Sequence, residues 1–365
     1  MKGYIPSHLK ERNSRVIYDL FDDGCCHSKA GISRLTGISA PTVMKIVDSL
    51  VEKNILLVKG EGESSVGRKP NLLVRNAKAY YAMGVDFQDG RIRIGLVDLD
   101  GRIVAYKESD LVSPAGELLT NTLGALAGSL LGEYGADRSR VLGICLGLPG
   151  IVDTENNTVE YAYNIGLNEK TDLAGMMARL EDCLGMPVFI ENDVNAAAIG
   201  EFRARGLGKD KDLVYISLGF GLGAGLVLNG RLRRGINYFA GEIAYTSFDE
   251  KYETGKAPRG WMEEKICGSA QEAIRAENVA PGYIKDASGK IALMLANLSV
   301  FLDFELAVLG GLLMKRFSND ILPAIEKSLQ GMSMFHIGCS TALSEFPELV
   351  GGAATVYEKR LKDVL

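Results

Sequence analysis

The stretch GLVDLDGRI, residues 95–103, has a second version in GLVLNGRL, residues 225–232, and this repeat decides the fold. Each copy lies in a longer segment, 81–106 and 213–234, in which apolar strands alternate with turns. Asp-Gly in the first copy and Asn-Gly in the second mark hairpin turns, because these residues tolerate positive φ. We therefore predict two copies of a three-stranded meander, with two unrelated hairpins as the alternative.

Helices and strands alternate after each copy, and this order predicts a duplicated α/β fold with a cleft between two lobes. Such a body has the actin-like, ribonuclease-H-like architecture of sugar kinases. We expect it to span residues 79–365, with one lobe over about 79–190, completed by the C-terminal helix, and the other over about 191–345. Residues 1–78 then form a separate domain.

Length and composition place the chain among ordinary globular proteins. Its 365 residues exceed one typical core, and 47% hydrophobic with 24% charged residues is usual for folded domains. The longest apolar stretch, residues 291–302, is too short for a membrane span, and the charged N-terminus does not resemble a signal peptide. The six cysteines form no CxxC pair, as in a reduced compartment. We expect a cytoplasmic protein that does not contact a membrane.

The charge is distributed unevenly between the two predicted parts. Residues 1–78 carry 13 Lys and Arg against 8 Asp and Glu, a net charge of +5, whereas the remainder of the chain carries −10. A basic block on an acidic body suggests that nucleic acid contacts the block and is kept away from the body.

The N-terminal domain begins with three short predicted helices. The first runs from Arg12 to about Asp22, Ser28 caps the second, Gly37 ends it, and Ser39 caps the third. The third helix has one apolar face, so its other side is free to enter a major groove of DNA. That side carries the residues that we expect to contact DNA, Ala40, Pro41, Thr42 and Lys45.

Two short strands, 55–58 and 72–74, follow the third helix and are joined by a polar segment, which is the pattern of a wing. Arg68 and Lys69 form the basic part of segment 67–70, a linker that we expect to lie in a narrow minor groove. The domain is therefore predicted to be a winged helix-turn-helix that binds DNA. A three-helix protein-interaction domain with a solvated basic turn is the alternative.

Six motifs in sequence order resemble those of the ROK family of repressors, open reading frames and kinases. They are a winged helix followed by GRKP at 67–70, GLPGIVD at 147–153, ENDVNAA at 191–197, YISLGFGLGAG at 215–225, AGEI at 240–243 and GG at 310–311. The N-terminal winged helix is the arrangement of the family's repressor branch. The resemblance covers nearly the whole chain and implies the two-lobed sugar-kinase fold.

The resemblance also implies a sugar site in the cleft. Asp193 matches the family's catalytic base, and it follows an apolar strand at the start of a predicted helix, where an ionised carboxylate is favoured. The residues that would hold the sugar, besides Asp193, are Asn164, Asn192, Glu242 and Glu263. Asp193 is alternatively a helix cap without a ligand, and the segment around Asn164 departs from the family's pattern.

The phosphate loops depart from those of the family's kinases. Where the kinases carry DxGGT, this chain reads DFQDGR at 86–91, so that Phe87 and Gln88 add bulk and Asp89 adds negative charge. In the second loop Phe220 replaces a threonine. Gly310-Gly311 then indicates a strand-to-helix turn, and we expect neither a nucleotide cofactor nor kinase activity.

The zinc motif of the family is missing as well. The places of its histidine and three cysteines are taken by Tyr245, Thr254, Lys256 and Trp261, so we expect no metal. Trp261 is expected to fill the space by packing.

These features favour a sugar-responsive transcriptional regulator, a repressor that binds operator DNA as a homodimer or larger homo-oligomer. Asp193 would then be a vestigial base that contacts a sugar or sugar-derivative effector without catalysis. One alternative is a ROK-type ATP-dependent sugar kinase with an added DNA-binding domain. Another is an oligomerisation scaffold with an inactive cleft.

Overall fold

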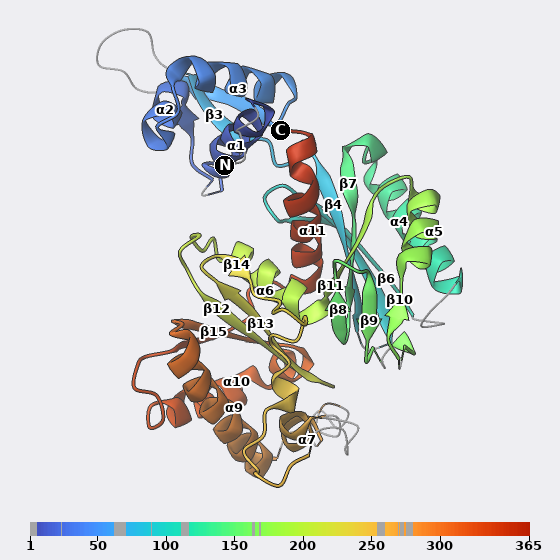
Figure 1. Cartoon of the computed structure of the whole chain (residues 1–365), viewed down its shortest axis with the longest axis vertical. Helices are drawn as coiled ribbons and strands as arrows, with labels where there is room; N and C mark the ends of the chain where they lie inside the picture. Colours follow the sequence, from blue (N-terminus) through green and yellow to red (C-terminus); the bar gives the residue numbers. More distant parts are fainter. Residues whose placement is uncertain are drawn as a thin grey trace.

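The computed structural model describes residues 6–22, 24–61, 71–88, 90–110, 117–162, 165–167, 169–253, 260–268, 270, 274 and 280–365. An N-terminal domain lies at one end of two α/β lobes, and the C-terminal helix α11 (Pro347–Arg360) runs from the lobes to that domain (Figure 1). Within the described ranges, no helix combines the length and the hydrophobicity that a membrane span requires.

The N-terminal domain consists of three helices and a small antiparallel sheet in which β3 is the central strand. Helix α2 begins where the Ser28 hydroxyl accepts a hydrogen bond from the Gly31 N–H, and it ends at Gly37, whose φ is 71°. The elements are α1 (Pro6–Asp19), β1 (His27–Ser28), α2 (Lys29–Thr36), α3 (Ala40–Glu52), β2 (Leu56–Glu61) and β3 (Asn71–Arg75).

One detail of this domain differs from the sequence prediction. Helix α1 starts earlier and ends at Asp19, because the chain turns there and buries Phe21 beside the ring of His27. Segment 67–70 lies outside the described residues, between β2 and β3 in the chain, which is where the sequence analysis places it, and the domain is joined to the body elsewhere. Residues 76–80 make that connection.

The first lobe is built on a five-stranded sheet in the order β11-β7-β4-β5-β6. Helices α4 (Glu117–Tyr134) and α5 (Ala174–Leu184) cover one face, and α11 packs on the other (Figure 1). A small antiparallel sheet of β8 (Ile151–Asp153), β9 (Thr158–Glu160) and β10 (Thr171–Asp172) lies beside it. The strands of the main sheet are β4 (Tyr81–Gln88), β5 (Arg91–Asp98), β6 (Ile103–Asp110), β7 (Val141–Leu148) and β11 (Val188–Asn192).

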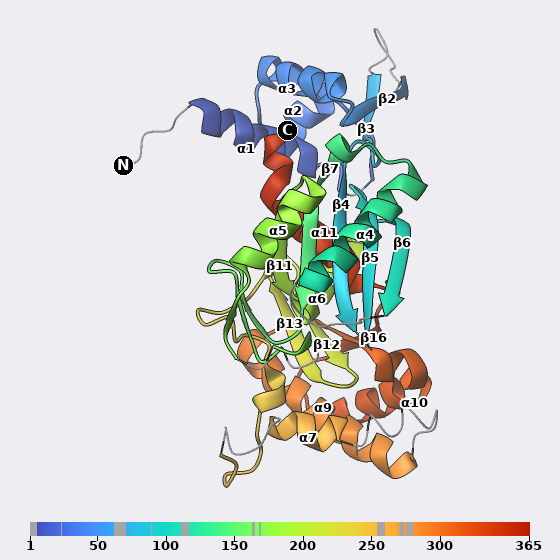
Figure 2. The same ribbon diagram turned by 90° about the vertical axis from the view of Figure 1, so that its right-hand side faces the viewer.

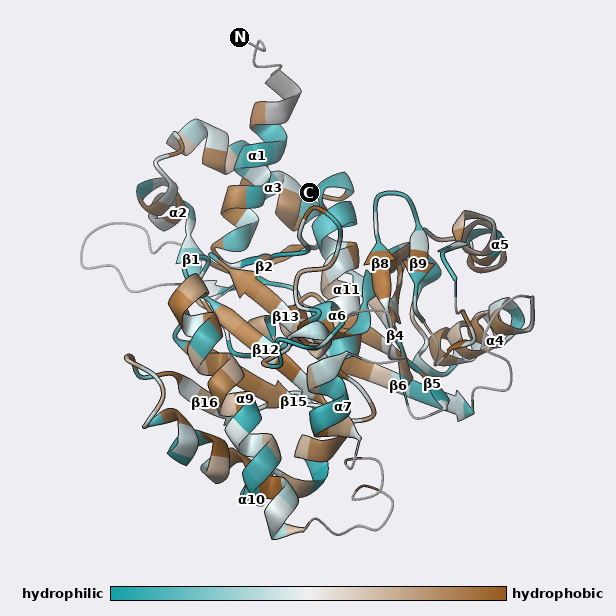
Figure 3. Cartoon of the chain, turned by 60° about the horizontal axis from the view of Figure 1, so that its bottom comes forward, coloured by the Kyte–Doolittle hydropathy of each residue, from teal (hydrophilic) through white to brown (hydrophobic). Residues whose placement is uncertain are grey.

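The second lobe repeats this topology, with the order β14-β13-β12-β15-β16. In each lobe three antiparallel strands form a meander, and two further strands join it in parallel. Figure 3 shows β12 and β15 as mostly hydrophobic, as expected for strands covered on both faces. The elements are β12 (Leu213–Leu218), β13 (Leu222–Leu228), β14 (Arg231–Leu232), α7 (Trp261–Cys267), α9 (Pro281–Leu302), β15 (Leu306–Gly310), α10 (Leu312–Leu329) and β16 (Gly338–Thr341).

The shared strand order confirms the predicted duplication, and the alternative of two unrelated hairpins is wrong. The two turns are nevertheless held differently. Asn229 and Gly230 both have positive φ, 50° and 67°. In the first copy only Gly101 does, and the Asp98 carboxylate accepts hydrogen bonds from two backbone N–H groups of the turn.

Helix α6 (Asp193–Ala204) connects the first lobe to the second and crosses α11 at very close range. A Cβ atom on Gly200 would lie 2.0 Å from the carbonyl oxygen of Pro347, and one on Gly351 would lie 1.6 Å from that of Ala196. Glycine is therefore required at both positions. In Figure 2 the second lobe lies below the first, and the N-terminal domain lies above the first.

The N-terminal domain is docked on the end of α11. One hydrophobic cluster contains residues of α1 and α3 together with Val356, Tyr357 and Leu361. The Lys53 ammonium donates to the carbonyl of Val364 at 3.0 Å. A further ion pair joins Asp19 of α1 to Lys209, which follows α6, at 2.5 Å. The domain thus contacts α11 and the loop that follows α6.

Candidate functional site

The candidate sugar site begins at the junction of β11 and α6. Asn192 is the N-cap residue of α6: its Oδ1 accepts from the Asn195 N–H at 2.8 Å, and its Nδ2 donates to the Gly150 carbonyl at 2.9 Å. Both ends of this amide are therefore engaged within the protein, and these contacts favour a positioning role. The cap that we considered for Asp193 is supplied by its neighbour, so Asp193 is available for another role.

An ion pair that sequence reasoning missed lies directly behind this junction. Glu191 is fully buried, and its carboxylate accepts hydrogen bonds from Arg234 Nε at 3.0 Å and Nη2 at 2.6 Å. Arg234 stands in the chain between β14 and Glu242. The pair thus ties the loop that carries Glu242 to the strand that carries Asn192, and removing one partner would leave a buried charge alone.

Three of the predicted ligand residues lie within electrostatic reach of one another. Burial raises the pKa of Asp193 to about 7, and the charges of Asp86 and Glu242 add to the effect. Burial likewise raises the pKa of Glu242, which precedes the short helix η3 (Ile243–Tyr245), to about 7, and Glu263 contributes. The cleft therefore holds a group of hydrogen-bonding carboxyls. Asn164 lies outside the described residues.

Two further buried acids, which sequence reasoning did not single out as ligands, extend this group. Asp86 at the end of β4 is bonded to Arg93 at 3.2 Å. Glu348, in the first turn of α11, is buried, and burial with the nearby charge of Asp86 raises its pKa to about 8. Because α11 carries Glu348 beside the cleft, the C-terminal helix is part of the site.

Glu348 provides a test of the electrostatics. Its folded pKa lies above its unfolded value, so the native state binds a proton that the unfolded state lacks between about pH 4.5 and about pH 8. Its contribution to stability therefore decreases as pH rises through this range. We expect Glu348→Gln to raise Tm by several degrees at pH 8 and to leave it nearly unchanged at pH 5.

Thermal denaturation at the two pH values checks this, with Glu345→Gln as the control because Glu345 is exposed in the preceding loop. Equal shifts for Glu348→Gln at both pH values would show that the carboxyl titrates normally in the folded protein.

The first phosphate loop differs from the sequence prediction in one residue. Phe87 does not add bulk there, because strand alternation points its side chain into the core of the first lobe, where it is 4% exposed. Gln88 does face this region, and its Oε1 accepts from Arg93 at 3.4 Å. Phe220, in the second loop, packs against the core of the second lobe. Asp89 lies outside the described residues.

An aromatic group stands beside Asp86 and Arg93. The ring of Phe346, just before α11, stacks on Tyr106 of β6 with centroids 4.8 Å apart. Arg93 and Lys315 lie 5.9 and 5.2 Å from the same ring. These contacts join the first lobe to α10 at the side of the cleft where the sequence predicts lost phosphate loops.

Gly310 and Gly311 form the turn between β15 and α10. A Cβ on Gly310 would lie 2.0 Å from the Tyr215 hydroxyl oxygen, and Gly311 has a φ of 84°. Local packing therefore accounts for both glycines without a nucleotide.

The residues at the family's zinc positions do not fit a zinc ion. Tyr245 packs 5.5 Å from the ring of Phe239, and Trp261 packs against the second-lobe core with its ring 5.9 Å from that of Phe248. Thr254 and Lys256 lie outside the described residues. Within the described ranges, no group of three His, Cys, Asp or Glu side chains is arranged to hold a metal.

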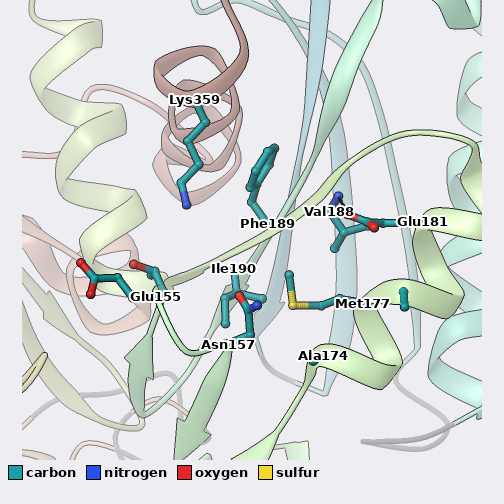
Figure 4. A pocket seen from close by; sticks show the side chains of 11 residues that line it. Glu155, Asn157, Ala174, Met177, Glu181, Val188, Phe189, Ile190 and Lys359 are labelled. Carbon is teal, nitrogen blue, oxygen red and sulfur yellow. Dashed lines mark hydrogen bonds between the residues drawn. The ribbon is translucent and has the colours of Figure 1, made fainter.

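A pocket of about 310 Å³ opens on the first lobe, away from these residues (Figure 4). It lies between α5, β11 and the β8–β9 hairpin, and Lys359 of α11 reaches its rim. None of the predicted ligand residues lines it, so it is separate from the candidate sugar site.

The candidate DNA-binding face lies on α3. Val43, Ile46, Val47 and Leu50 are buried in the domain core, whereas Ala40, Pro41 and Lys45 are exposed on the opposite side. Thr42 is half-buried, and its hydroxyl is 2.9 Å from that of Ser39. Three of the four residues of α3 that we predicted to contact DNA thus have solvent-exposed side chains. Arg68 and Lys69 lie outside the described residues.

Comparison with known proteins supplies the family context. A model described as the ROK family matches residues 82–336. The xylose repressor of Caldicellulosiruptor bescii is 31% identical over 242 residues, which are 66% of this chain and 60% of that repressor. The chain therefore spans less than two thirds of this relative's length.

Two solved structures share the fold. A ROK family transcriptional regulator, described as a homolog of the Escherichia coli MLC protein, aligns over 98% of both chains with a TM-score of 0.78 and 20% identity. A ROK family glucokinase from Streptomyces griseus, in complex with glucose and AMPPNP, aligns over 76% of this chain and 99% of its own, with a TM-score of 0.63 and 25% identity. The first alignment includes the N-terminal domain.

Proposed function

Because this chain belongs to the ROK family, we propose that it is a sugar-responsive DNA-binding regulator, a repressor whose body binds a sugar without phosphorylating it. The observation that carries this proposal is the helix-turn-helix with an exposed α3 face, docked by a continuous core on a kinase-like body. We assign DNA binding to residues 1–78 and sugar binding to residues 79–365. Such a regulator acts in the cytoplasm, where its operator lies.

Loss of phosphoryl transfer is the second part of the proposal. Transfer depends on donors that hold the nucleotide phosphates in line. At the two loops, Gln88 is bonded to Arg93 and Phe220 supplies no hydroxyl. A sugar kinase with an added DNA-binding domain is the competing proposal, supported by the retained Asp193. It requires sugar-stimulated ADP release that Asp193→Asn abolishes.

The sugar would act on DNA binding through the helices α6 and α11. Helix α6 begins at Asp193 in the site, and Lys209 after its end pairs with Asp19 of the DNA-binding domain. Helix α11 carries Glu348 beside the site, and its far end packs in the core of that domain. A change in lobe closure would therefore move α11 and the loop after α6, on which the DNA-binding domain rests. In a dimer, this alters the spacing of two recognition helices.

The sugar contacts are assigned to Asp193, Glu242 and Glu263, with Asn192 holding the start of α6 in position. Asn164 as a further ligand residue, and Arg68 with Lys69 as DNA contacts, stay predictions from the sequence.

Lys45→Ala tests the DNA-binding face. Lys45 is an exposed cation on α3. When one phosphate contact is lost, binding releases fewer counterions from the DNA. We expect operator affinity to fall about 5- to 20-fold at moderate salt, and the slope of log Kd against log salt to decrease by about 1. Fluorescence anisotropy with operator DNA at several salt concentrations measures both.

Lys285→Ala is the matched control, because it removes the same charge from an exposed position of α9 in the second lobe. Equal losses in the two variants would mean that net charge, and not contact by α3, sets the affinity.

A further inference from the structure

The charges around the cleft restrict the kind of sugar that it accepts. Building on the proposed function, we propose that the effector is an uncharged sugar and that the site excludes sugar phosphates. The inference concerns the hydroxyl nearest Asp193, which is the group that a kinase of this fold would phosphorylate.

Acidic groups reach this position from several elements. Asp86 of β4 is the sheet partner of Gly147, and a Cβ on Gly147 would lie 3.6 Å from the Cα of Asp193, so the two acids are neighbours. The charges of Asp86 and Glu242 act on Asp193, that of Glu263 acts on Glu242, and those of Asp86 and Asp193 act on Glu348. A phosphate on the sugar hydroxyl beside Asp193 would place up to two negative charges among these groups, where the reduced polarity strengthens repulsion.

Among the described residues, three cations near these carboxyls are engaged by the protein. Arg93 donates to Asp86 and lies 3.6 Å from Glu108. Lys315 donates to the Glu345 carbonyl at 2.8 Å and lies over Phe346. Arg234 is held by Glu191. A bound phosphate would have to take one of these cations from its partner.

The helix terminus in the site is also satisfied internally. The first N–H groups of a helix commonly bind phosphate. At the start of α6, however, the Val194 N–H donates to the Asp193 carboxylate and the Asn195 N–H donates to Asn192, both at 2.8 Å. The two side chains thus occupy donors that an anion would use.

A neutral sugar, in contrast to a sugar phosphate, matches the hydrogen-bonding groups of the site. Each of its hydroxyls carries a proton to donate, and carboxylates are acceptors with room for several such bonds. The carboxyls therefore bind hydroxyls without a charge conflict, at any protonation state that they adopt near neutral pH.

Matched pairs of ligands test the inference on the full chain. Calorimetric titration at pH 7.5 compares glucose, mannose and N-acetylglucosamine with their 6-phosphates. We expect at least one free sugar to bind and its phosphate to bind at least about 100-fold more weakly, which corresponds to about 2.7 kcal/mol. The ratio should shrink at pH 6, where the carboxyls take up protons.

Asp193→Asn removes the negative charge of the side chain but keeps its size, so it tests whether charge causes the discrimination against phosphates. We expect this variant to reduce the discrimination between a sugar and its phosphate at least about tenfold, whereas Asp182→Asn, on the exposed side of α5, leaves the ratio unchanged. A phosphate that binds as tightly as its free sugar would overturn the inference and leave the proposed regulator intact. If no free sugar binds while the chain still binds DNA, both the inference and the sugar response are wrong.

Discussion

Replacement of Gly351 by alanine is expected to destabilise the folded protein by more than about 3 kcal/mol, and to lower Tm by at least about 4 °C. The new Cβ would lie 1.6 Å from the carbonyl oxygen of Ala196, which belongs to the backbone of α6. Relief requires α6 and α11 to separate, because a backbone atom cannot rotate away as a side chain can. Thermal denaturation measures the change.

Gly289→Ala on α9 is the matched control. Gly289 is also helical, but an added Cβ there meets nothing within 4 Å. Alanine should leave stability unchanged or raise it by about 0.5–1 kcal/mol, because it reduces the freedom of the unfolded chain. A Gly351→Ala variant as stable as the control would show that the two helices do not cross this closely.

Glu242→Ala is expected to weaken sugar binding about 10- to 100-fold and to abolish the effect of sugar on DNA binding. Glu242 interacts electrostatically with both Asp193 and Glu263, and each charge-assisted hydrogen bond to a hydroxyl contributes about 1.5–3 kcal/mol. DNA affinity without sugar should stay at the wild-type value, because α3 and its core are remote in the fold. Calorimetry with sugar and anisotropy with DNA measure the two properties separately.

Glu264→Ala serves as the control for lost charge, since Glu264 is exposed on α7 next to Glu263. Should Glu242→Ala respond to sugar as the wild type does, the effector binds elsewhere, and the pocket of the first lobe becomes the place to look.

The duplicated body was predictable because its signals are local. Strand alternation, glycine turns and the two versions of one short pattern, 95–103 and 225–232, specify the meanders within short stretches of chain. The parallel strands β7, β11, β15 and β16 then follow from the order of elements. The docking of the N-terminal domain on α11 was not predictable, because it joins apolar residues from opposite ends of the chain.

Phe87 shows where the site prediction failed and what signal was available. Met83, Val85 and Phe87 alternate with Gly84, Asp86 and Gln88, so the apolar set belongs to one face of β4. The sequence analysis treats residues 86–91 as a phosphate loop, and a loop would not show the two-residue alternation of a strand. The strand continues to Gln88, and Asp86 and Gln88, on its other face, both contact Arg93.

Asn192 and Arg234 show a different limit. Adjacent Asn192 and Asp193 are both good capping residues, and sequence alone does not decide which one caps α6. Arg234 meets Glu191 from a loop in the other lobe. That contact depends on the relative position of the two lobes, and a local sequence pattern does not predict this position.

A single binding titration decides whether the protein is a sugar-responsive regulator. The full chain is titrated into labelled DNA from upstream of its own gene, with and without the free sugar that binds in calorimetry, and without ATP. We predict salt-dependent binding whose Kd changes at least about tenfold when the sugar is added. DNA binding that ignores the sugar, together with sugar-stimulated ADP release that Asp193→Asn abolishes, would contradict this and identify a kinase.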